Sequence, residues 1–411
     1  MEKRLSFRAN ALYNTVGTLF YSFSLWVTVV VVARFFSSYD TAGIFQLAIS
    51  VSNIFFAVST YNMRTFQVSD TENAYSAGEY LGMRFVTGGL SLLLCVLYAI
   101  FSGYSLRVVA CIGVYMIFKL NETMADVYHA VDQKADRMDY VGISHLLRGL
   151  VTLISFVLSL WISHDLLIAL AVMAAAVNLT MLLYDVPHSA RLDAVRPVFS
   201  FKRIGRLLLL CLPAVIASSS YAAVVTVPRQ VLEKLAGEAL LGAYGTVATP
   251  LVVVQVLATG IFNPLLNGFA EDCKKKDGRH LLKTVGKALA GLLIFALLAF
   301  TGAYFLGEPV LVLLCGEAIR PYVSLMYPIL ATTLLYAAGW IAVNLLIVLR
   351  RLKTLMVISL IALLFSALLS SPLIRAFGAD GVSYTVIICY ALHGLLGALT
   401  VLTEFHQKKE I

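Results

Sequence analysis

Long apolar stretches separated by short polar segments run along almost the whole chain. A helix needs about 20 apolar residues to cross the hydrocarbon core of a bilayer. Windows of this kind occur twelve times in the 411 residues, six in each half. They are Asn10–Ala33, Ala42–Asn62, Gly82–Phe101, Leu106–Ala125, Val141–Ile162, Leu166–Tyr184, Leu207–Val227, Leu240–Phe262, Ala288–Leu306, Val323–Leu349, Leu355–Ile374 and Val382–Leu402. The pattern predicts an all-α, polytopic membrane protein with twelve transmembrane helices.

The basic residues are distributed unevenly between the two sets of loops that these spans create. With the N-terminus in the cytoplasm, the external loops hold only six of the 31 Lys and Arg residues. Lys119 lies within a span, and the cytoplasmic segments hold the rest. Such asymmetry follows the positive-inside rule, and adding or removing one span would invert every later loop. We therefore predict a multi-pass protein with both termini in the cytoplasm.

The longest interruption in mid-chain divides the spans into two sets of six. It is the basic, proline-containing segment DVPHSARLDAVRPVFSFKRIGR, from Asp185 to Arg206. We predict an N-terminal six-helix lobe over residues 1–184, a cytoplasmic linker over 185–206 and a C-terminal six-helix lobe over 207–411. Because six is even, both halves enter the membrane from the same side, so a repeat between them would be parallel.

Composition and motifs narrow the possible function classes. The chain is 60% hydrophobic and 13% charged, whereas soluble globular chains carry about 25% charged residues. Cytoplasmic basic residues account for the net charge of +8, and no compact soluble segment exists to bind nucleic acid. The six cysteines are scattered, which is neither a disulfide framework nor a metal pattern. With no phosphate loop, zinc-protease motif or serine elbow, the sequence favours transport over catalysis and indicates no cofactor.

The fourth span carries a stripe of polar groups that lipid would reject. Tyr115, Lys119, Glu122, Asp126 and His129 are spaced 4, 3, 4 and 3 residues apart, so they share one face of a helix. A charge at the membrane centre costs about 2.5–3.5 kcal/mol on insertion scales, so we expect the stripe to face the bundle interior. The Lys119–Glu122 pair either neutralises itself or lines a transport path, and we favour the path. Asp126 and His129 fit a helix that is leaving the membrane.

Further cations lie at matching depths in other spans. Arg34 ends the first span, Arg64 ends the second, and Arg148 lies about two turns into the fifth. Snorkelling to the interface would also explain Arg34 and Arg229, and the positive-inside rule alone would explain Arg64. An interior with more cations than anions suits an anionic substrate. Because a planar guanidinium can bind two oxygens at once, arginine suits a phosphate group in particular.

Four segments of the chain resemble a known family. They are RFFSSYDTAGIFQLAISVSNIFFAVSTYNMRTFQVSD (Arg34–Asp70), FKLNETMADVYHAVDQKADRMDYVGISHLLRG (Phe118–Gly149), LLCGEAIRPYVSLMYPIL (Leu313–Leu330) and FGADGVSYTVI (Phe377–Ile387). On these segments the chain resembles the bacterial polysaccharide repeat-unit flippases, the Wzx-type exporters of O-antigen, capsule or teichoic acid. They are related to the multidrug and toxic-compound extruders (MATE) within the multidrug/oligosaccharidyl-lipid/polysaccharide (MOP) exporter superfamily. The chain departs from the family in its span count, since many members have up to fourteen, and at Cys315, where an aromatic residue is common.

The resemblance implies a MATE-like fold of two six-helix lobes around a central cavity that opens alternately to either side. It implies an undecaprenyl-diphosphate-linked oligosaccharide as cargo, carried across the bacterial cytoplasmic (inner) membrane, with a polysaccharide polymerase and other assembly proteins as partners. The diphosphate is then expected at a cationic face formed by Arg148, Lys119, Arg34 and Arg64. The sugars are expected to meet Tyr115, Tyr221 and Tyr244. Glu122 is the candidate for sensing a coupling ion, either H⁺ or Na⁺.

Three other functions compete with this interpretation. A drug or metabolite extruder of the same superfamily would bind organic cations and should line its cavity with carboxylates. A flippase for a lipid-linked peptidoglycan precursor is hard to separate by sequence, although that family usually has fourteen spans. A membrane enzyme of polysaccharide assembly, such as a polymerase or acyltransferase, would need a reactive group at a membrane surface, and His145 is its candidate.

Overall fold

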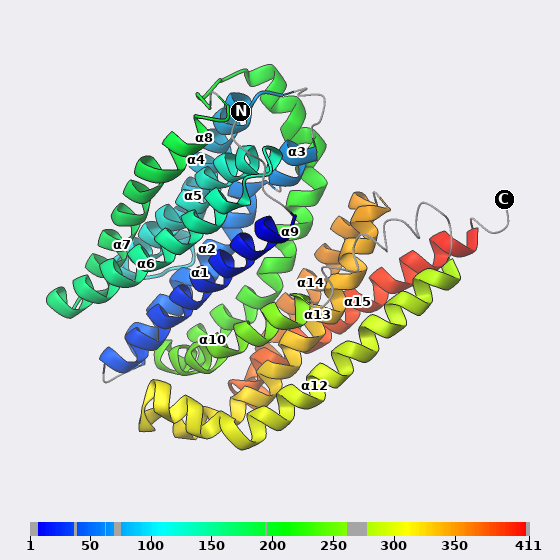
Figure 1. The fold of residues 1–411 in the computed structure, drawn as a ribbon. Coiled ribbons are helices and arrows are strands. Elements are labelled where there is room, and N and C mark those ends of the chain that lie inside the picture. Colours follow the sequence, from blue (N-terminus) through cyan, green and yellow to red (C-terminus); the bar gives the residue numbers. More distant parts are fainter. Residues whose placement is uncertain are drawn as a thin grey trace. The chain divides into compact units, whose positions relative to one another are not determined.

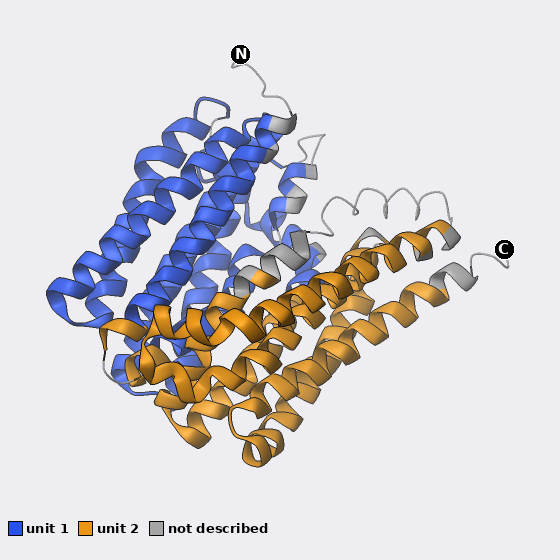
Figure 2. Cartoon of the chain, turned by 60° about the horizontal axis from the view of Figure 1, so that its bottom comes forward, with its two compact units in different colours: residues 1–32, 44–215 blue, residues 33–43, 216–411 orange. Residues whose placement is uncertain are grey.

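The structure is a computed structural model that describes residues 7–36, 39–61, 63–69, 75–193, 195–260, 278–349 and 351–407. Throughout these ranges the regular structure is helical, with no strand (Figure 1). The chain divides into two compact units, which are residues 1–32 with 44–215 and residues 33–43 with 216–411 (Figure 2).

The first unit contains most of the N-terminal helices. They are α1 (Phe7–Phe35), α2 (Asp40–Thr60), α3 (Met63–Ser69), α4 (Ala77–Phe101), α5 (Leu106–Lys134), α6 (Met138–Ser163) and α7 (Leu166–Thr180). A π-helical turn (Met181–Asp185) then joins α7 to the short α8 (Val186–Ser189). Polar side chains cap several of these helices, as orphan backbone groups require. Ser76 and Glu79 form a capping box at the start of α4, and Asp165 accepts hydrogen bonds from two backbone amides at the start of α7.

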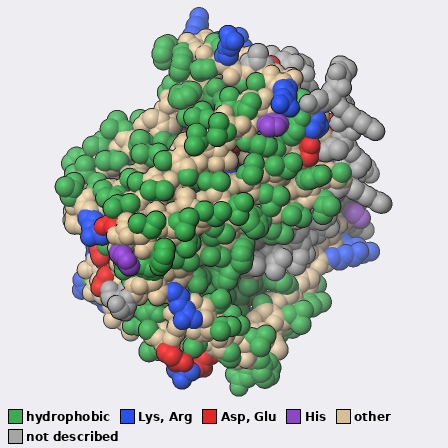
Figure 3. Space-filling view, turned by 60° about the vertical axis from the view of Figure 1, so that its left-hand side comes forward, with side chains coloured by type: hydrophobic (Ala, Val, Ile, Leu, Met, Phe, Trp, Pro, Cys, Tyr) green, Lys and Arg blue, Asp and Glu red, His purple; other side chains and the backbone are tan. Residues whose placement is uncertain are grey.

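The second unit contains the C-terminal helices. They are the larger part of α9 (Phe201–Ala236), α10 (Glu238–Gly260), α12 (Gly278–Cys315), a 3₁₀ segment (Glu317–Leu325), α13 (Met326–Val348), α14 (Leu352–Phe377) and α15 (Asp380–Gln407). Large apolar side chains of α12 such as Leu293, Leu297 and Leu298 are more than half exposed, as expected for a surface that meets lipid tails. Hydrophobic side chains also dominate the molecular face in Figure 3, where charged ones gather near the edges.

The helices confirm the prediction of an all-α, multi-pass membrane protein. Eleven stretches of the described residues are helical, long enough and apolar enough to cross a bilayer, and each overlaps one predicted window. The remaining window, Leu240–Phe262, is occupied by α10 up to Gly260, while Ile261 and Phe262 lie outside the described residues. The predicted number of twelve spans is therefore not reproduced as such. Several helices extend beyond their predicted windows, because a helix continues through polar residues whose side chains form hydrogen bonds or ion pairs inside the unit.

The compact units divide the chain at different places from the predicted lobes. Their boundary lies within α9, between Val215 and Ile216, and residues 33–43 are grouped with the second unit. Within that unit, Gly43 and Gly242 let the start of α2 and α10 approach so closely that an added Cβ would collide with facing backbone. Within the predicted linker, Val198 packs on the first unit, where its amide donates to the Gly78 carbonyl at 2.9 Å.

Glycines also bring α1 and α6 together in the first unit. An added Cβ on Gly17 would collide with the backbone of Gly142, and one on Gly142 would collide with the backbone of Tyr13. Small residues of this kind allow membrane helices to pack backbone against backbone. The contact is extended at one end by Asn10, whose side chain accepts from the Met138 amide at 3.0 Å. This close contact positions two pocket-lining elements, α1 and α6.

Candidate functional site

The polar stripe of α5 faces the interior of the first unit, as its spacing predicts. The Tyr115, Lys119 and His129 residues are at most 8% exposed. Next to the stripe is a cavity of about 380 Å³, which we call the polar pocket. Its lining comes from α1, α2, α3, α5 and α6 and consists of Tyr21, Phe56, Thr60, Met63, Arg64, Glu122, Asp126, His129, His145 and Arg148.

Glu122 holds one side of the polar pocket together. Its carboxylate accepts a hydrogen bond from the Tyr21 hydroxyl at 2.6 Å and forms an ion pair with Lys119. The Lys119 ammonium also lies over the ring of Phe56, 4.2 Å from its centroid. Lys119 is thus neutralised by Glu122 and further stabilised by an aromatic face. The lysine contacts groups that line the pocket without itself being part of the lining.

Arg148 holds another side of the pocket and is 1% exposed. Its Nη2 donates to the backbone carbonyl of Asn121 at 3.0 Å and to the Asn121 side-chain oxygen. Its Nε lies 3.9 Å from Oδ2 of Asp185, and neither of these two buried atoms has a hydrogen-bond partner. The other Asp185 oxygen lies 3.3 Å from Nε2 of His129, which also contacts the Ser144 hydroxyl at 3.0 Å. Arg148 is therefore a buried cation with a donor to spare.

The main chain around Asp185 is unusual. Asp185 is the last residue of the π-helical turn between α7 and α8, and its side chain is almost fully buried. Single π-helical turns in α-helices are frequent at functional sites, because the extra residue shifts the direction in which side chains point. Here the turn directs a carboxylate toward Arg148 and His129.

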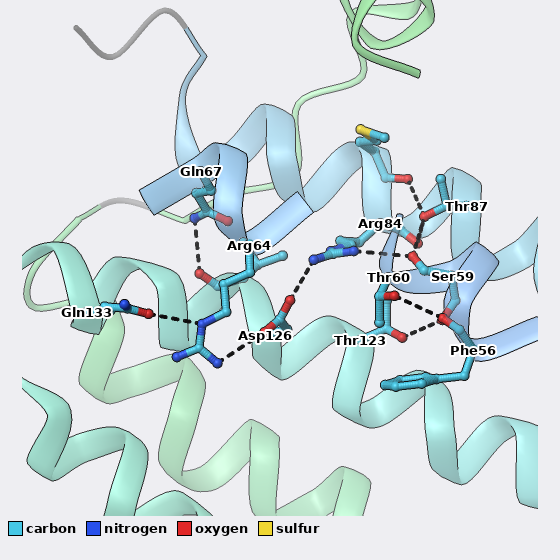
Figure 4. Close-up of polar contacts among 12 residues, drawn as sticks. Phe56, Ser59, Thr60, Arg64, Gln67, Arg84, Thr87, Thr123, Asp126 and Gln133 are labelled. Atoms are coloured by element: carbon cyan, nitrogen blue, oxygen red, sulfur yellow. Dashed lines mark hydrogen bonds and ion pairs between the residues drawn. The ribbon is translucent and has the colours of Figure 1, made fainter. Parts of the chain in front are cut away.

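A third group joins α3, α4 and α5 through Asp126 (Figure 4). Its Oδ2 accepts from Nη2 of Arg84 at 2.6 Å, and its Oδ1 accepts from Nη1 of Arg64 at 3.3 Å. Arg64 also donates through Nε to the Gln133 side chain at 3.1 Å. Arg84 donates through Nη1 to the backbone carbonyl of Ser59 at 3.3 Å. One carboxylate is thus shared between two guanidinium groups.

His145 completes the pocket between α1 and α5. Its ring stacks on Tyr21 with centroids 5.7 Å apart and meets His129 edge-on at 5.0 Å. Its Nδ1 is buried and has no hydrogen-bond partner. Among the residues that the structure describes, no group of three or more His, Cys, Asp and Glu residues is arranged to hold a metal ion.

The other residues that the sequence singled out lie elsewhere. Arg34 belongs to the second unit, where its guanidinium donates to the backbone carbonyls of Leu313 and Leu314 at the end of α12. Such contacts satisfy carbonyls that a helix C-terminus leaves unpaired. Tyr115 lies in the first unit but outside the pocket lining, and its ring packs edge-on against Phe45.

Two predicted tyrosines belong to the second unit. The Tyr221 ring packs against Tyr336, Tyr390 and His393, with centroids 4.9–5.4 Å apart. The Tyr244 hydroxyl lies 2.9 Å from that of Ser383, and the Arg229 guanidinium lies 5.8 Å from the centroid of the Tyr244 ring. The structure therefore brings together Arg64, Glu122 and Arg148 in one pocket and leaves Arg34, Tyr221 and Tyr244 in the other unit.

Sequence reasoning missed several members of the site. Arg84 lies only two residues inside its predicted span, where the interface with water would explain a charge, whereas its side chain is 1% exposed. Asp185 was assigned to the linker, although it is buried beside Arg148. With these two included, the cluster has four cations (Arg64, Arg84, Lys119 and Arg148) and three carboxylates (Glu122, Asp126 and Asp185). The excess of cations in this cluster is one.

Comparisons with known proteins give the fold a context. No protein-family model matches the chain. The chain is 24% identical to the capsular polysaccharide biosynthesis protein CapF of Staphylococcus aureus over 310 residues. This match covers 74% of this chain and 76% of CapF. The lipid II flippase MurJ in an inward closed conformation superposes with a TM-score of 0.72 at 14% identity, over 96% of this chain and 89% of that chain. The MATE transporter VcmN of Vibrio cholerae superposes with a TM-score of 0.64 at 15% identity, over 97% of this chain and 98% of the VcmN chain.

The chain therefore has the fold of MurJ and of the MATE transporters of the MOP superfamily. This confirms, at the level of the fold, the resemblance to this superfamily. The structures that it resembles are transporters by name.

Proposed function

We propose that this protein is a flippase that moves an undecaprenyl-diphosphate-linked oligosaccharide across the cytoplasmic membrane by alternating access. The diphosphate binds in the polar pocket, where Arg64 and Arg148 face the cavity. Both termini lie in the cytoplasm, the sugars contact tyrosines such as Tyr115, Tyr221 and Tyr244, and the product passes to a polymerase of surface polysaccharide assembly. The protein acts by binding and moving its cargo and forms no new bond in it.

The single observation that carries this proposal is the presence of two pocket-lining guanidinium groups between helices long and apolar enough to span a membrane. An intramembrane charge is expensive, and it usually faces a cavity that serves a charged substrate. An anion is the chemical partner of a guanidinium, and a diphosphate offers oxygens to both arginines at once. The volume of about 380 Å³ is at the lower end for small-ligand sites, so it suits a headgroup rather than a whole oligosaccharide.

Two of the comparisons agree with this substrate. One chain of the same fold is named as a lipid flippase, and one relative in sequence is named for capsular polysaccharide biosynthesis. A flippase for the lipid-linked unit of a surface polysaccharide combines the two names. Glu122 then serves as the ion-sensing group, because binding of H⁺ or Na⁺ at its carboxylate would weaken its hold on Lys119.

The main alternative is an extruder of organic cations, since the pocket lining includes the carboxylates of Glu122 and Asp126. Each of these carboxylates already has a cation, Lys119 for the first and both Arg64 and Arg84 for the second. A cationic drug would have to displace these partners and would then leave buried charges without compensation, which is costly. The geometry therefore favours an anionic cargo.

Flipping is tested with purified protein in liposomes that contain a fluorescent undecaprenyl-diphosphate oligosaccharide. Transport is measured as the exposure of the label to a membrane-impermeant quencher, and an uncharged undecaprenol glycoside is the matched control substrate. We expect the diphosphate to be flipped and the neutral lipid to be left in place. Equal flipping of both lipids would contradict the diphosphate site, transport of organic cations alone would favour the extruder, and chemical conversion of the lipid would favour an enzyme.

Arg34 gives a prediction that separates two roles. Because Arg34 donates through Nε and Nη2 to backbone carbonyls at the end of α12, Arg34→Met is expected to lower the thermal unfolding temperature of the protein by a few degrees, the order of two lost hydrogen bonds. Its affinity for farnesyl diphosphate is expected to match the wild type. Thermal unfolding and equilibrium binding on the same sample measure both quantities, and a selective loss of affinity would place Arg34 in the binding site instead.

A further inference from the structure

The two arginines that share Asp126 differ in how firmly they hold it. Arg84 binds it at 2.6 Å, and its side chain is 1% exposed. Arg64 binds it at 3.3 Å, and its side chain is 30% exposed. A short, charge-assisted hydrogen bond away from water is the stronger of the two. Asp126 therefore serves mainly as the counterion of Arg84.

The surroundings of Arg84 show why it needs this counterion. Its Nη1 donates to the Ser59 carbonyl, an acceptor that it shares with the Thr87 hydroxyl at 2.8 Å. Its Nε is buried and has no hydrogen-bond partner. A buried guanidinium that lost its carboxylate would be an uncompensated charge, which proteins tolerate poorly. Arg84 is thus anchored between α2, α4 and α5 and does not reach the pocket lining.

Arg64 is in the opposite situation. It lines the polar pocket, and its Nε interaction is with Gln133, a neutral acceptor. Of the remaining cations, Lys119 is paired with Glu122, and Arg148 is fixed by two oxygens of Asn121 with Asp185 3.9 Å away. The excess positive charge of the cluster is therefore located mainly on Arg64. An incoming anion can therefore bind Arg64 with a smaller loss of existing interactions than it would cause at the other cations.

Given that the polar pocket binds a diphosphate, as proposed above, we propose that Arg64 is the cation that exchanges Asp126 for the diphosphate. Arg84 is a positioning residue that keeps Asp126 from neutralising Arg64. When the diphosphate arrives, Asp126 stays with Arg84, and the Arg64 guanidinium turns from the carboxylate to the phosphate oxygens. In this arrangement, the anion affinity of the pocket depends on a residue that never touches the ligand.

A purely structural role for the Arg64–Asp126–Arg84 group makes different predictions. If the group only joined α3, α4 and α5, every substitution in it would weaken the protein, and two substitutions would weaken it more than one. If Arg84 keeps Asp126 from neutralising Arg64, the loss of Arg84 alone should lower the diphosphate affinity. Removing Arg84 and the Asp126 charge together should restore that affinity. A double-mutant cycle separates the two cases.

The experiment measures equilibrium binding of farnesyl diphosphate, with farnesol as the uncharged control, to the full chain in lipid nanodiscs. Arg64→Gln is expected to weaken binding about tenfold or more, the size of a lost hydrogen bond between charged groups. Arg84→Gln should weaken binding about threefold to tenfold, because Asp126 then pairs with Arg64. Asp126→Asn should tighten binding. Arg84→Gln with Asp126→Asn should return the affinity to within about twofold of the wild type.

The outcomes keep the inference separate from the proposed function. Wild-type protein that binds farnesyl diphosphate no better than farnesol would overturn the diphosphate site itself. Wild-type binding that Arg64→Gln weakens, with a double variant that binds as weakly as Arg84→Gln or more weakly, would overturn only the positioning role. Where Arg84→Gln fails to fold, the comparison of Asp126→Asn and the double variant with the wild type decides: affinities below the wild type in both would refute the role of Arg84. Arg107→Gln, which removes an exposed arginine of α5 that pairs with Asp165, is the matched control.

Discussion

Replacing Arg148 by methionine is expected to destabilise the first unit and to slow transport. The methionine keeps much of the side-chain volume but removes a guanidinium that donates to two oxygens of Asn121 and lies 3.9 Å from Asp185. The Asp185 carboxylate, 1% exposed, would keep only polar neighbours such as His129. Breaking a buried ion pair by removing one partner costs about 3–5 kcal/mol. Transport should fall at least about tenfold, since a charged hydrogen bond to the cargo is lost as well.

The measurements are thermal unfolding and the liposome flipping assay described above, carried out on the same preparation. Arg148→Lys keeps the charge but not the planar fork, so we expect it to recover stability more fully than transport. Arg107→Met is the matched control on an exposed cation, 60% of whose side chain faces solvent, and it should behave as the wild type. Normal transport by Arg148→Met at equal amounts of folded protein would remove Arg148 from the proposed site.

Replacing Gly142 by valine is expected to separate α1 from α6 and to prevent stable folding of the first unit. A Cβ at this position would collide with the backbone of Tyr13, which cannot move aside as a flexible side chain would. Inserting extra atoms into a packed contact costs typically 1–3 kcal/mol and more where backbone must shift, so we expect about 3 kcal/mol or more. The polar pocket should be lost with it, because Tyr21 is on α1 whereas His145 and Arg148 are on α6.

The measurement is the fraction of purified protein that elutes as a single species, together with its thermal unfolding temperature. Gly89→Val in α4 is the matched control, since an added Cβ there would meet nothing within 4 Å. It should retain the monodisperse fraction and the unfolding temperature of the wild type to within a few degrees. Equal behaviour of the two variants would mean that the α1–α6 contact is not as close as the structure has it.

The polar stripe of α5 shows how far local pattern reaches. The spacing of Lys119, Glu122, Asp126 and His129 was enough to place them on one face, because helix geometry determines which residues are neighbours. The cost of charge in a membrane was enough to direct this face inward. The partners of these residues come from other helices, however, and no spacing within α5 could identify Tyr21, Arg84 or Asp185.

Arg84 and Asp185 show why the rest of the site escaped prediction. Each lies near the end of an apolar window, where a charge is normally explained by the interface with water. Whether such a residue is solvated or buried depends on how far the helix continues and what packs over it. The packing of α2 and α5 against the first turns of α4 settles this for Arg84, and the π-helical turn after α7 settles it for Asp185.

The sequence by itself determined the helical, multi-pass architecture and the inward direction of the α5 stripe. These follow from hydrophobic length, helical periodicity and the cost of charge in lipid, all of which act along a single segment. Only the tertiary structure decided that Arg64, Glu122 and Arg148 share a pocket, that Arg34 serves the end of α12 instead, and that three carboxylates nearly balance four cations. The physical reason is that the charge of a site is a sum over residues from different helices. That sum is set by which helices pack together.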